Sequence, residues 1–205
     1  MENVERKINF NDYFTGIRKF YSKKKFFKIF GGEIRIYDEN KEKLLCFVKQ
    51  KAFKLKEDIL VYADETMQQV ILRIKAESIL DLATTYSIYK YNNQIEIKIG
   101  ALKREFLKSL IRDSWKILDE YNNEVGYIQE DSMFKAMLRR YLINLIPQTF
   151  EIYYKDKLSG ILKQTFNPFI AQFKADFSIN PEFPLELGIA SLILLQFIEG
   201  RQSEN

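Results

Sequence analysis

A basic segment near the start of the chain carries the side chains with the clearest chemistry. It covers residues 15–30, contains no acid, and has phenylalanine, tyrosine and isoleucine residues interleaved with its six lysines and arginines. Cations beside aromatic rings are the side chains that bind an anionic membrane surface or a nucleic-acid backbone. The segment also fits a solvated lead-in followed by a first strand at 26–30 with its apolar side chains buried, so both interpretations stay open.

Two later segments add cations that could bind the same kind of partner. Apolar and polar residues alternate along 70–77, so Arg73 and Lys75 should point away from the core. A basic run then contains Lys98, Lys103, Arg104, Lys108 and Arg112. Each cation near an anionic surface contributes about 1 kcal/mol, so several on one patch would bind measurably and scattered ones would not. The chain balances 32 basic against 28 acidic residues, and these cations also fit an ordinary soluble surface.

The sequence lacks the residues of most catalytic and metal sites. It has no histidine and a single cysteine, which excludes histidine general bases, Ser-His-Asp triads and thiolate zinc sites. The acid pairs at 64–65 and 130–131 fall at the ends of predicted strands, where adjacent side chains point to opposite faces. The acidic stretch 38–42 lacks the ligand spacing and central glycine of an EF-hand loop. We therefore predict a non-enzymatic protein with no cofactor and no bound metal.

Residues 184–199 predict a helix that is apolar on every side. Up to Ile198 its polar residues are Glu186, Ser191 and Gln196, too few to form a wet face. Such a helix is either a membrane span or the centre of a core. About 16 residues at 1.5 Å each give about 24 Å, whereas a span needs about 20 residues. We therefore expect a buried core helix and no transmembrane span.

Short alternating segments with polar turns make up most of the remaining chain. Four hairpins are predicted, with turns at 38–40, 92–93, 122–123 and near Asp156. The return strands of the last three contain a glycine, which indicates a bulge or a close backbone approach; these are Gly100, Gly126 and Gly160.

A further strand pair covers 59–77, and 169–177 alternates with Phe173, Ala175 and Phe177 on one face. Residues 132–146 instead have helical spacing that ends at Pro147. About twelve strands joined by hairpins imply a sandwich or a barrel, and a barrel closed around the apolar helix leaves no sheet edge. The predicted fold class is mainly β, an antiparallel barrel of about twelve strands enclosing the hydrophobic C-terminal α-helix.

Four segments of the sequence resemble the LURP-one-related proteins. They are LRIKAESILDLATTYSIYK, IGALKREFLKSLIRDSWKILD, NEVGYIQEDS and LELGIASLILLQFIEGRQ. This family belongs with the phospholipid scramblases and the tubby C-terminal domain in one superfamily, and the resemblance covers roughly residues 25–203. It implies a twelve-stranded barrel with the C-terminal helix through its centre. Tubby domains bind phosphoinositide headgroups through exposed basic residues, but no tubby lipid-binding motif matches this chain residue by residue.

We expect a lead-in over residues 1–22 and one tubby-like barrel domain over 23–203, with its central helix at 184–199. The favoured function is peripheral binding to anionic phospholipid or phosphoinositide headgroups, and the alternative is a protein-interaction or structural scaffold with an unknown protein partner. Nucleic acid is not an expected partner, because no DNA- or RNA-binding signature is present. The candidate lipid-binding residues are Arg18, Lys19, Lys23, Lys24, Lys25, Lys28, Arg73, Lys75, Lys103 and Arg104.

The expected location is the cytoplasm, with peripheral association at the inner membrane surface. A single cysteine, Cys46, allows no internal disulfide and fits a reducing compartment. Residues 1–14 contain acids and no apolar signal segment.

Overall fold

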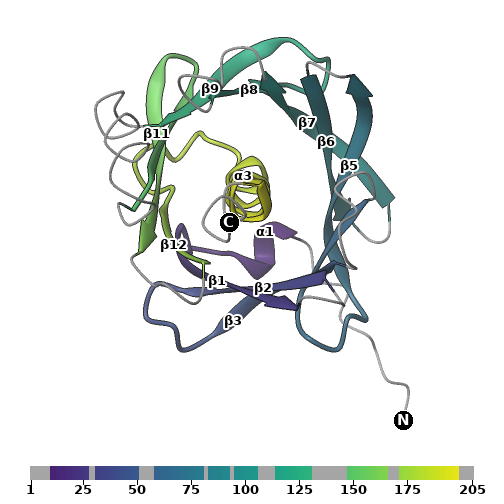
Figure 1. The fold of residues 1–205 in the computed structure, drawn as a ribbon, viewed down its shortest axis with the longest axis vertical. Helices are drawn as coiled ribbons and strands as arrows, with labels where there is room; N and C mark the ends of the chain where they lie inside the picture. The colour runs from purple at the N-terminus through teal and green to yellow at the C-terminus, as the bar shows by residue number, and fades with distance from the viewer. Residues whose placement is uncertain are drawn as a thin grey trace.

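Twelve strands form one closed antiparallel barrel around a helix (Figure 1). The computed structural model describes residues 10–27, 31–50, 58–80, 83–92, 95–105, 114–130, 147–165 and 171–198. Within these ranges the prediction of a mainly β barrel that encloses the hydrophobic C-terminal helix is confirmed.

Each strand pairs with its neighbours in sequence, and the first strand also pairs with the last to close the barrel. The elements are α1 (Phe10–Tyr13), β1 (Lys19–Phe27), β2 (Gly31–Asp38), β3 (Leu44–Gln50), β4 (Ile59–Tyr62), β5 (Val70–Leu80), β6 (Ala83–Asn92), β7 (Ile95–Glu105), β8 (Ser114–Leu118), β9 (Glu124–Glu130), β10 (Thr149–Tyr154), β11 (Lys157–Thr165), β12 (Ala171–Asp176) and α3 (Leu185–Ile198).

Short polar turns join the strands where the sequence predicts them. In the β8–β9 turn the Asp119 carboxylate accepts hydrogen bonds from the backbone N–H groups of Tyr121 (2.9 Å) and Asn123 (2.8 Å). In the β2–β3 turn the Asp38 carboxylate accepts one from Glu42 N–H at 2.8 Å. These aspartates hold the chain reversal locally, so each hairpin is specified by its own sequence. The predicted turn at 92–93 reaches outside the described residues, as does the predicted helix at 132–146.

Helix α3 fills the barrel and has no wet face. Its side chains Ile189, Leu192 and Leu194 are fully buried. Alternate residues of the strands, such as Ile36 on β2 and Leu162 on β11, pack around it from the inner wall. The sheet therefore supplies the apolar surroundings that an all-apolar helix requires. Among the helices in the described part of the chain, none combines the length and the apolar character needed to cross a bilayer.

The glycines of the return strands mark close approaches, as predicted. A Cβ atom at Gly126 would collide with the carbonyl oxygen of Tyr153, and one at Gly100 with that of Leu118. At Gly160 the added atom would lie 2.8 Å from Cδ1 of Phe177. All three positions therefore require glycine, because no side chain fits there.

The first strand begins earlier than the sequence analysis places it. β1 starts at Lys19, inside the stretch 1–22 that we expected to be a lead-in. Phe10 and Phe14, also in that stretch, are buried in the core, and the Phe14 ring lies 6.0 Å from that of Phe20. The high density of lysines obscures the strand pattern, because only Phe20, Ser22 and Lys24 of its described side chains face inward.

Arg18 fastens the start of β1 to the loop that leads into α3. Its guanidinium donates hydrogen bonds to the carbonyl oxygens of Phe177 (2.7 Å), Asn180 (3.2 Å) and Phe183 (2.7 Å). Partial burial lowers the pKa of Arg18, and the Glu186 carboxylate opposes that shift. Arg18 therefore has a structural role at the base of α3, and its predicted lipid-binding role stays a prediction.

Replacing Arg18 with alanine should lower the free energy of unfolding by about 2 kcal/mol, because three carbonyl acceptors lose a charged donor. Urea unfolding monitored by circular dichroism measures this loss. Arg18→Lys should recover part of it, since one ammonium cannot reproduce the planar fork that serves three carbonyls. An unchanged unfolding midpoint for Arg18→Ala would contradict the role of this contact.

Candidate functional site

The candidate cations on β1 divide between the two faces of the strand. Lys19, Lys23 and Lys25 point outward, whereas Lys24 is 4% exposed and faces the barrel interior. The Lys24 ammonium lies 5.7 Å from the centroid of the Phe197 ring on α3. Alternation along one strand therefore separates Lys24 from its neighbours. The candidate residue Lys28 lies outside the described residues, as do Lys108 and Arg112.

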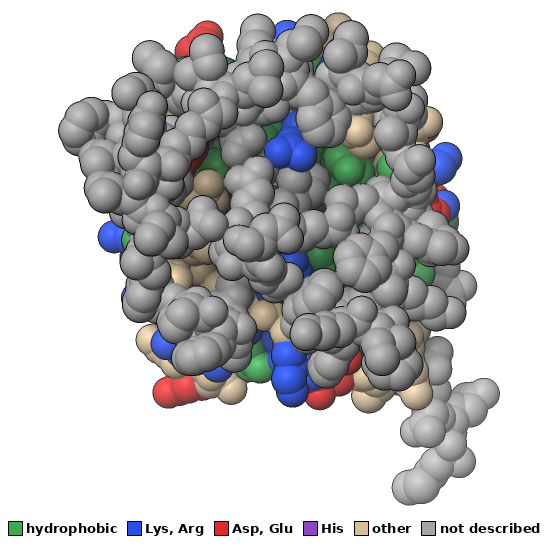
Figure 2. All heavy atoms as spheres, in the orientation of Figure 1, with side chains coloured by type: hydrophobic (Ala, Val, Ile, Leu, Met, Phe, Trp, Pro, Cys, Tyr) green, Lys and Arg blue, Asp and Glu red, His purple; other side chains and the backbone are tan. Residues whose placement is uncertain are grey.

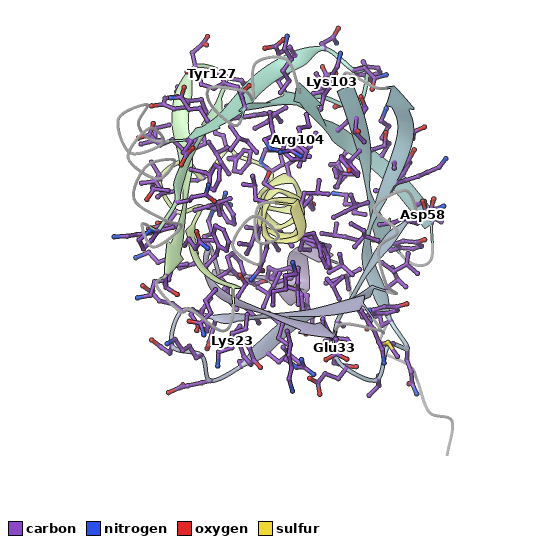
Figure 3. The ribbon with its side chains drawn as sticks, viewed as in Figure 1. Lys23, Glu33, Asp58, Lys103, Arg104 and Tyr127 are labelled. Atoms are coloured by element: carbon purple, nitrogen blue, oxygen red, sulfur yellow. The ribbon has the colours of Figure 1, made fainter. Side chains whose placement is uncertain are left out.

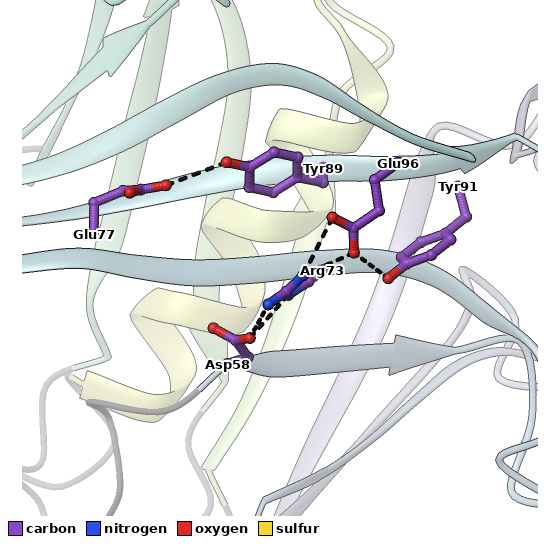
Figure 4. A network of polar contacts seen from close by, with 6 residues as sticks. All are labelled: Asp58, Arg73, Glu77, Tyr89, Tyr91 and Glu96. Carbon is purple, nitrogen blue, oxygen red and sulfur yellow. Dashed lines mark hydrogen bonds and ion pairs between the residues drawn. The ribbon is translucent and has the colours of Figure 1, made fainter. Parts of the chain in front are cut away.

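Arg73 belongs to a network of polar contacts on the outer face of β5, β6 and β7 (Figure 4). Its guanidinium donates to Asp58 Oδ2 at 2.9 Å and to Glu96 Oε1 at 2.8 Å. These hydrogen bonds, Asp58 first, raise the pKa of Arg73. The Tyr91 hydroxyl and Arg73 both donate to Glu96 and together lower the pKa of that carboxyl. Arg73 points away from the core as predicted, but two carboxylates balance its charge.

The other candidates on β5 and β7 do not join the lysines of β1. Lys75 lies on the outer face of β5, two positions from Arg73. Lys103 points outward on the side of the barrel opposite Lys23, and Arg104 points inward toward α3 (Figure 3). The Arg104 guanidinium lies 5.8 Å from the centroid of the Trp115 ring. Around the visible rim of the molecule, basic and acidic side chains are mixed (Figure 2).

One part of the outer wall nevertheless gathers lysines from distant parts of the sequence. We call it the lysine patch, and it consists of Lys19, Lys23, Lys41, Lys163 and Lys174. Tyr21 on β1 lies at its centre, because Lys174 is its cross-strand partner on β12 and Lys163 is the next partner on β11. The ammonium groups of Lys41 and Lys23 lie 4.2 Å and 5.5 Å from the Tyr21 ring centroid.

Sequence reasoning identified Lys19 and Lys23 but missed the remaining members of the patch. Lys163 and Lys174 sit in strands that reach β1 only when the barrel closes through the β1–β12 pair. A usable signal was present, since alternation in 171–177 assigns Phe173 and Ala175 to the core and leaves Lys174 outside. Combining that pattern with the closing pair would have placed Lys174 beside Tyr21.

Lys163 and Lys174 form a cross-strand pair of like charge. They are directly opposite each other in the antiparallel register of β11 and β12, and both are exposed. Opposed residues in such a pair have Cβ atoms about 5 Å apart, and like charges there are destabilising. Within the described ranges neither lysine has a carboxylate within ion-pair distance. The pair is therefore suited to holding an anion between its two ammonium groups.

A surface pocket of 190 Å³ opens beside this pair, and Lys19, Tyr21 and Ile161 also line it. Its acids Glu39 and Asp176 each lie 3.8 Å from the Lys19 ammonium. Burial, and to a smaller degree the neighbouring Tyr37, raises the pKa of Tyr21. Its phenol therefore stays neutral and adds no negative charge. The pocket therefore combines positive side chains with an apolar wall.

Catalytic and metal chemistry finds little support in the described part of the chain. No group of three or more histidine, cysteine, aspartate or glutamate side chains there could hold a metal ion. Burial raises the pKa of the Cys46 thiol, which keeps this group protonated and unreactive. The lysine patch is thus the arrangement with the clearest capacity to bind a ligand.

A family model of the LURP-one-related proteins matches residues 44–195. The chain belongs to the LURP-one-related family. The match confirms the resemblance and runs from β3 into α3, so Lys163 and Lys174 lie inside the LURP-one-related region while Lys19, Lys23 and Lys41 precede it. Comparisons with curated proteins and with solved structures give no match.

Proposed function

We propose that this LURP-one-related domain is a non-enzymatic module that binds anionic phospholipid surfaces through the lysine patch. The observation that supports the proposal is the convergence of five lysines around Tyr21, of which Lys19 is balanced by the acids Glu39 and Asp176 and the other four are not balanced by any described acid. At about 1 kcal/mol for each of these four lysines, the patch supplies about 4 kcal/mol near an anionic surface. That energy corresponds to a dissociation constant of about 1 mM, and salt weakens the binding.

The proposal places the protein in the cytoplasm, with the outer wall of β1, β11 and β12 against the inner membrane surface. It replaces the scattered candidate set with one face, because only neighbouring cations can contact a bilayer together. Arg73 is left out since Asp58 and Glu96 balance its charge. Lys103 is left out because it lies on the side of the barrel opposite Lys23 and points outward there (Figure 3).

Co-sedimentation of the purified protein with liposomes tests this proposal. The vesicles contain phosphatidylcholine alone, or phosphatidylcholine with phosphatidylserine or phosphoinositides, at low and physiological salt, with and without calcium. We expect binding only to the anionic vesicles, and weaker binding at the higher salt. The variant Lys23→Ala/Lys163→Ala/Lys174→Ala should reduce this binding at least about tenfold.

The matched control removes the same charge elsewhere. Lys75→Ala/Lys98→Ala/Lys103→Ala also lowers the net charge from +4 to +1, but on β5 and β7. It should keep most of the binding if the patch is the contact surface. Equal losses in both variants would mean that only net charge matters. If the unmodified protein bound no vesicle, the proposal would be wrong and a scaffold with a protein partner would be favoured.

A further inference from the structure

We propose that the pocket at Lys163 and Lys174 is a specific site for a phosphate monoester, carried either by phosphatidate in a bilayer or by a soluble molecule such as glycerol 3-phosphate. The inference deepens the proposed function and rests on it for the lipid source. It differs from diffuse attraction to a charged surface, because it assigns one ligand group to one pocket.

The charges of the pocket are unequally satisfied. Asp176 accepts hydrogen bonds through Oδ1 from the backbone N–H (2.9 Å) and the hydroxyl (2.6 Å) of Ser178, and its Oδ2 faces Lys19. Glu39 faces the same ammonium of Lys19. The acids of the pocket are thus engaged, whereas Lys163 and Lys174 lie directly opposite each other and, among the described residues, form no ion pair. The unsatisfied charge of this pocket is positive.

A phosphate monoester matches two opposed ammonium groups better than a diester does. It carries a charge of about −1.5 to −2 near neutral pH and has three strong acceptor oxygens. One such group can accept charge-assisted hydrogen bonds from Lys163 and Lys174 together. The diester of phosphatidylserine carries a single negative charge on its phosphate, with two non-bridging oxygens, and offsets less of the repulsion between the lysines.

The remaining walls bear on the character of the ligand. The volume of 190 Å³ has room for a phosphate group and the first atoms of its ester. Ile161 and the ring of Tyr21 contribute apolar surface next to the lysines. These walls suit the carbon atoms next to a terminal phosphate. The pocket therefore fits a phosphate ester whose first carbon atoms lie against Ile161 and Tyr21.

The test compares phosphatidate vesicles with phosphatidylserine vesicles that are adjusted to the same surface potential. We expect the unmodified protein to bind phosphatidate about tenfold more tightly, which corresponds to about 1.4 kcal/mol. Lys163→Ala/Lys174→Ala should lose this preference while keeping residual binding to both vesicles. Lys23→Ala/Lys25→Ala, which changes cations outside the pocket lining, should weaken both and keep the preference. Removing the like-charge pair should leave ligand-free Lys163→Ala/Lys174→Ala at least as stable as the unmodified protein. A lower thermal unfolding temperature would therefore identify a variant that fails to fold.

A second arm separates the soluble source from the lipid source. Glycerol 3-phosphate should raise the thermal unfolding temperature of the unmodified protein but not that of Lys163→Ala/Lys174→Ala, because a ligand stabilises the state that binds it. Dimethyl phosphate, a soluble diester, should have no effect. A shift with glycerol 3-phosphate supports the pocket even if no vesicle binds, and in that case only the proposed membrane function fails.

Equal binding to the two vesicle types together with no shift from glycerol 3-phosphate would overturn the inference while leaving the membrane function intact. A preference for phosphatidate that survives in Lys163→Ala/Lys174→Ala would also overturn it, because the monoester would then bind elsewhere.

Discussion

Replacing Leu192 with aspartate should abolish folding of the barrel. Leu192 is fully buried on α3, inside the closed sheet. Loss of the leucine side chain from a core costs about 2–5 kcal/mol, and a buried carboxylate without a partner adds several more. The sum reaches the whole stability of an ordinary domain, about 5–15 kcal/mol. Circular dichroism should show no cooperative thermal transition for this variant.

Two control variants separate burial from the chemistry of the substitution. Ile95→Asp introduces the same charge at a side chain that is 66% exposed, and its unfolding temperature should stay close to that of the unmodified protein. Leu192→Met roughly conserves volume and should cost less than about 1.5 kcal/mol. If Leu192→Asp melted cooperatively at the normal temperature and lost only membrane association, α3 would lie on the surface and the central-helix arrangement would be wrong.

The parts of the fold that could be predicted are those encoded locally. The apolar run at 184–199 fixes α3, because no arrangement of its side chains gives a wet face. The alternation at 70–77 places Leu72 and Ile74 in the core and turns Arg73 outward, as observed. The hairpin turns follow from aspartate and asparagine residues that bond to their own backbone. Each of these features is decided within a few residues.

The candidate site depends on contacts between distant parts of the chain, and it was predicted only in part. Lys19 and Lys174 come together because β1 pairs with β12, and the sequence does not state which strands close the barrel. Arg18 was grouped with the surface cations, yet its carbonyl partners lie 159 to 165 residues away along the chain. A basic run identifies cations, but the strand register decides which of them share a face.

The β12–α3 connection depends on a phenylalanine ring held between two glycines. Phe177 is fully buried, and a Cβ atom added to Gly188 on α3 would lie 3.0–3.1 Å from three of its ring carbons. A Cβ atom added to Gly160 on β11 would meet the same ring at 2.8 Å. Helix and sheet therefore approach each other closely only because neither position has a side chain.

Gly188→Val should lower the free energy of unfolding by about 3 kcal/mol, because the added methyl groups overpack this core contact. Urea unfolding of Gly188→Val, Phe177→Ala and the double variant measures how the two positions are coupled. Phe177→Ala alone should cost about 3–5 kcal/mol through the cavity that it leaves. In the double variant the valine occupies part of that cavity, so the total loss should be at least about 1 kcal/mol smaller than the sum of the single losses.

Additive losses would contradict the contact, because two residues that share one space cannot act independently. Gly160→Val with Phe177→Ala should show coupling of the same sign, since the ring meets both glycines from a single position.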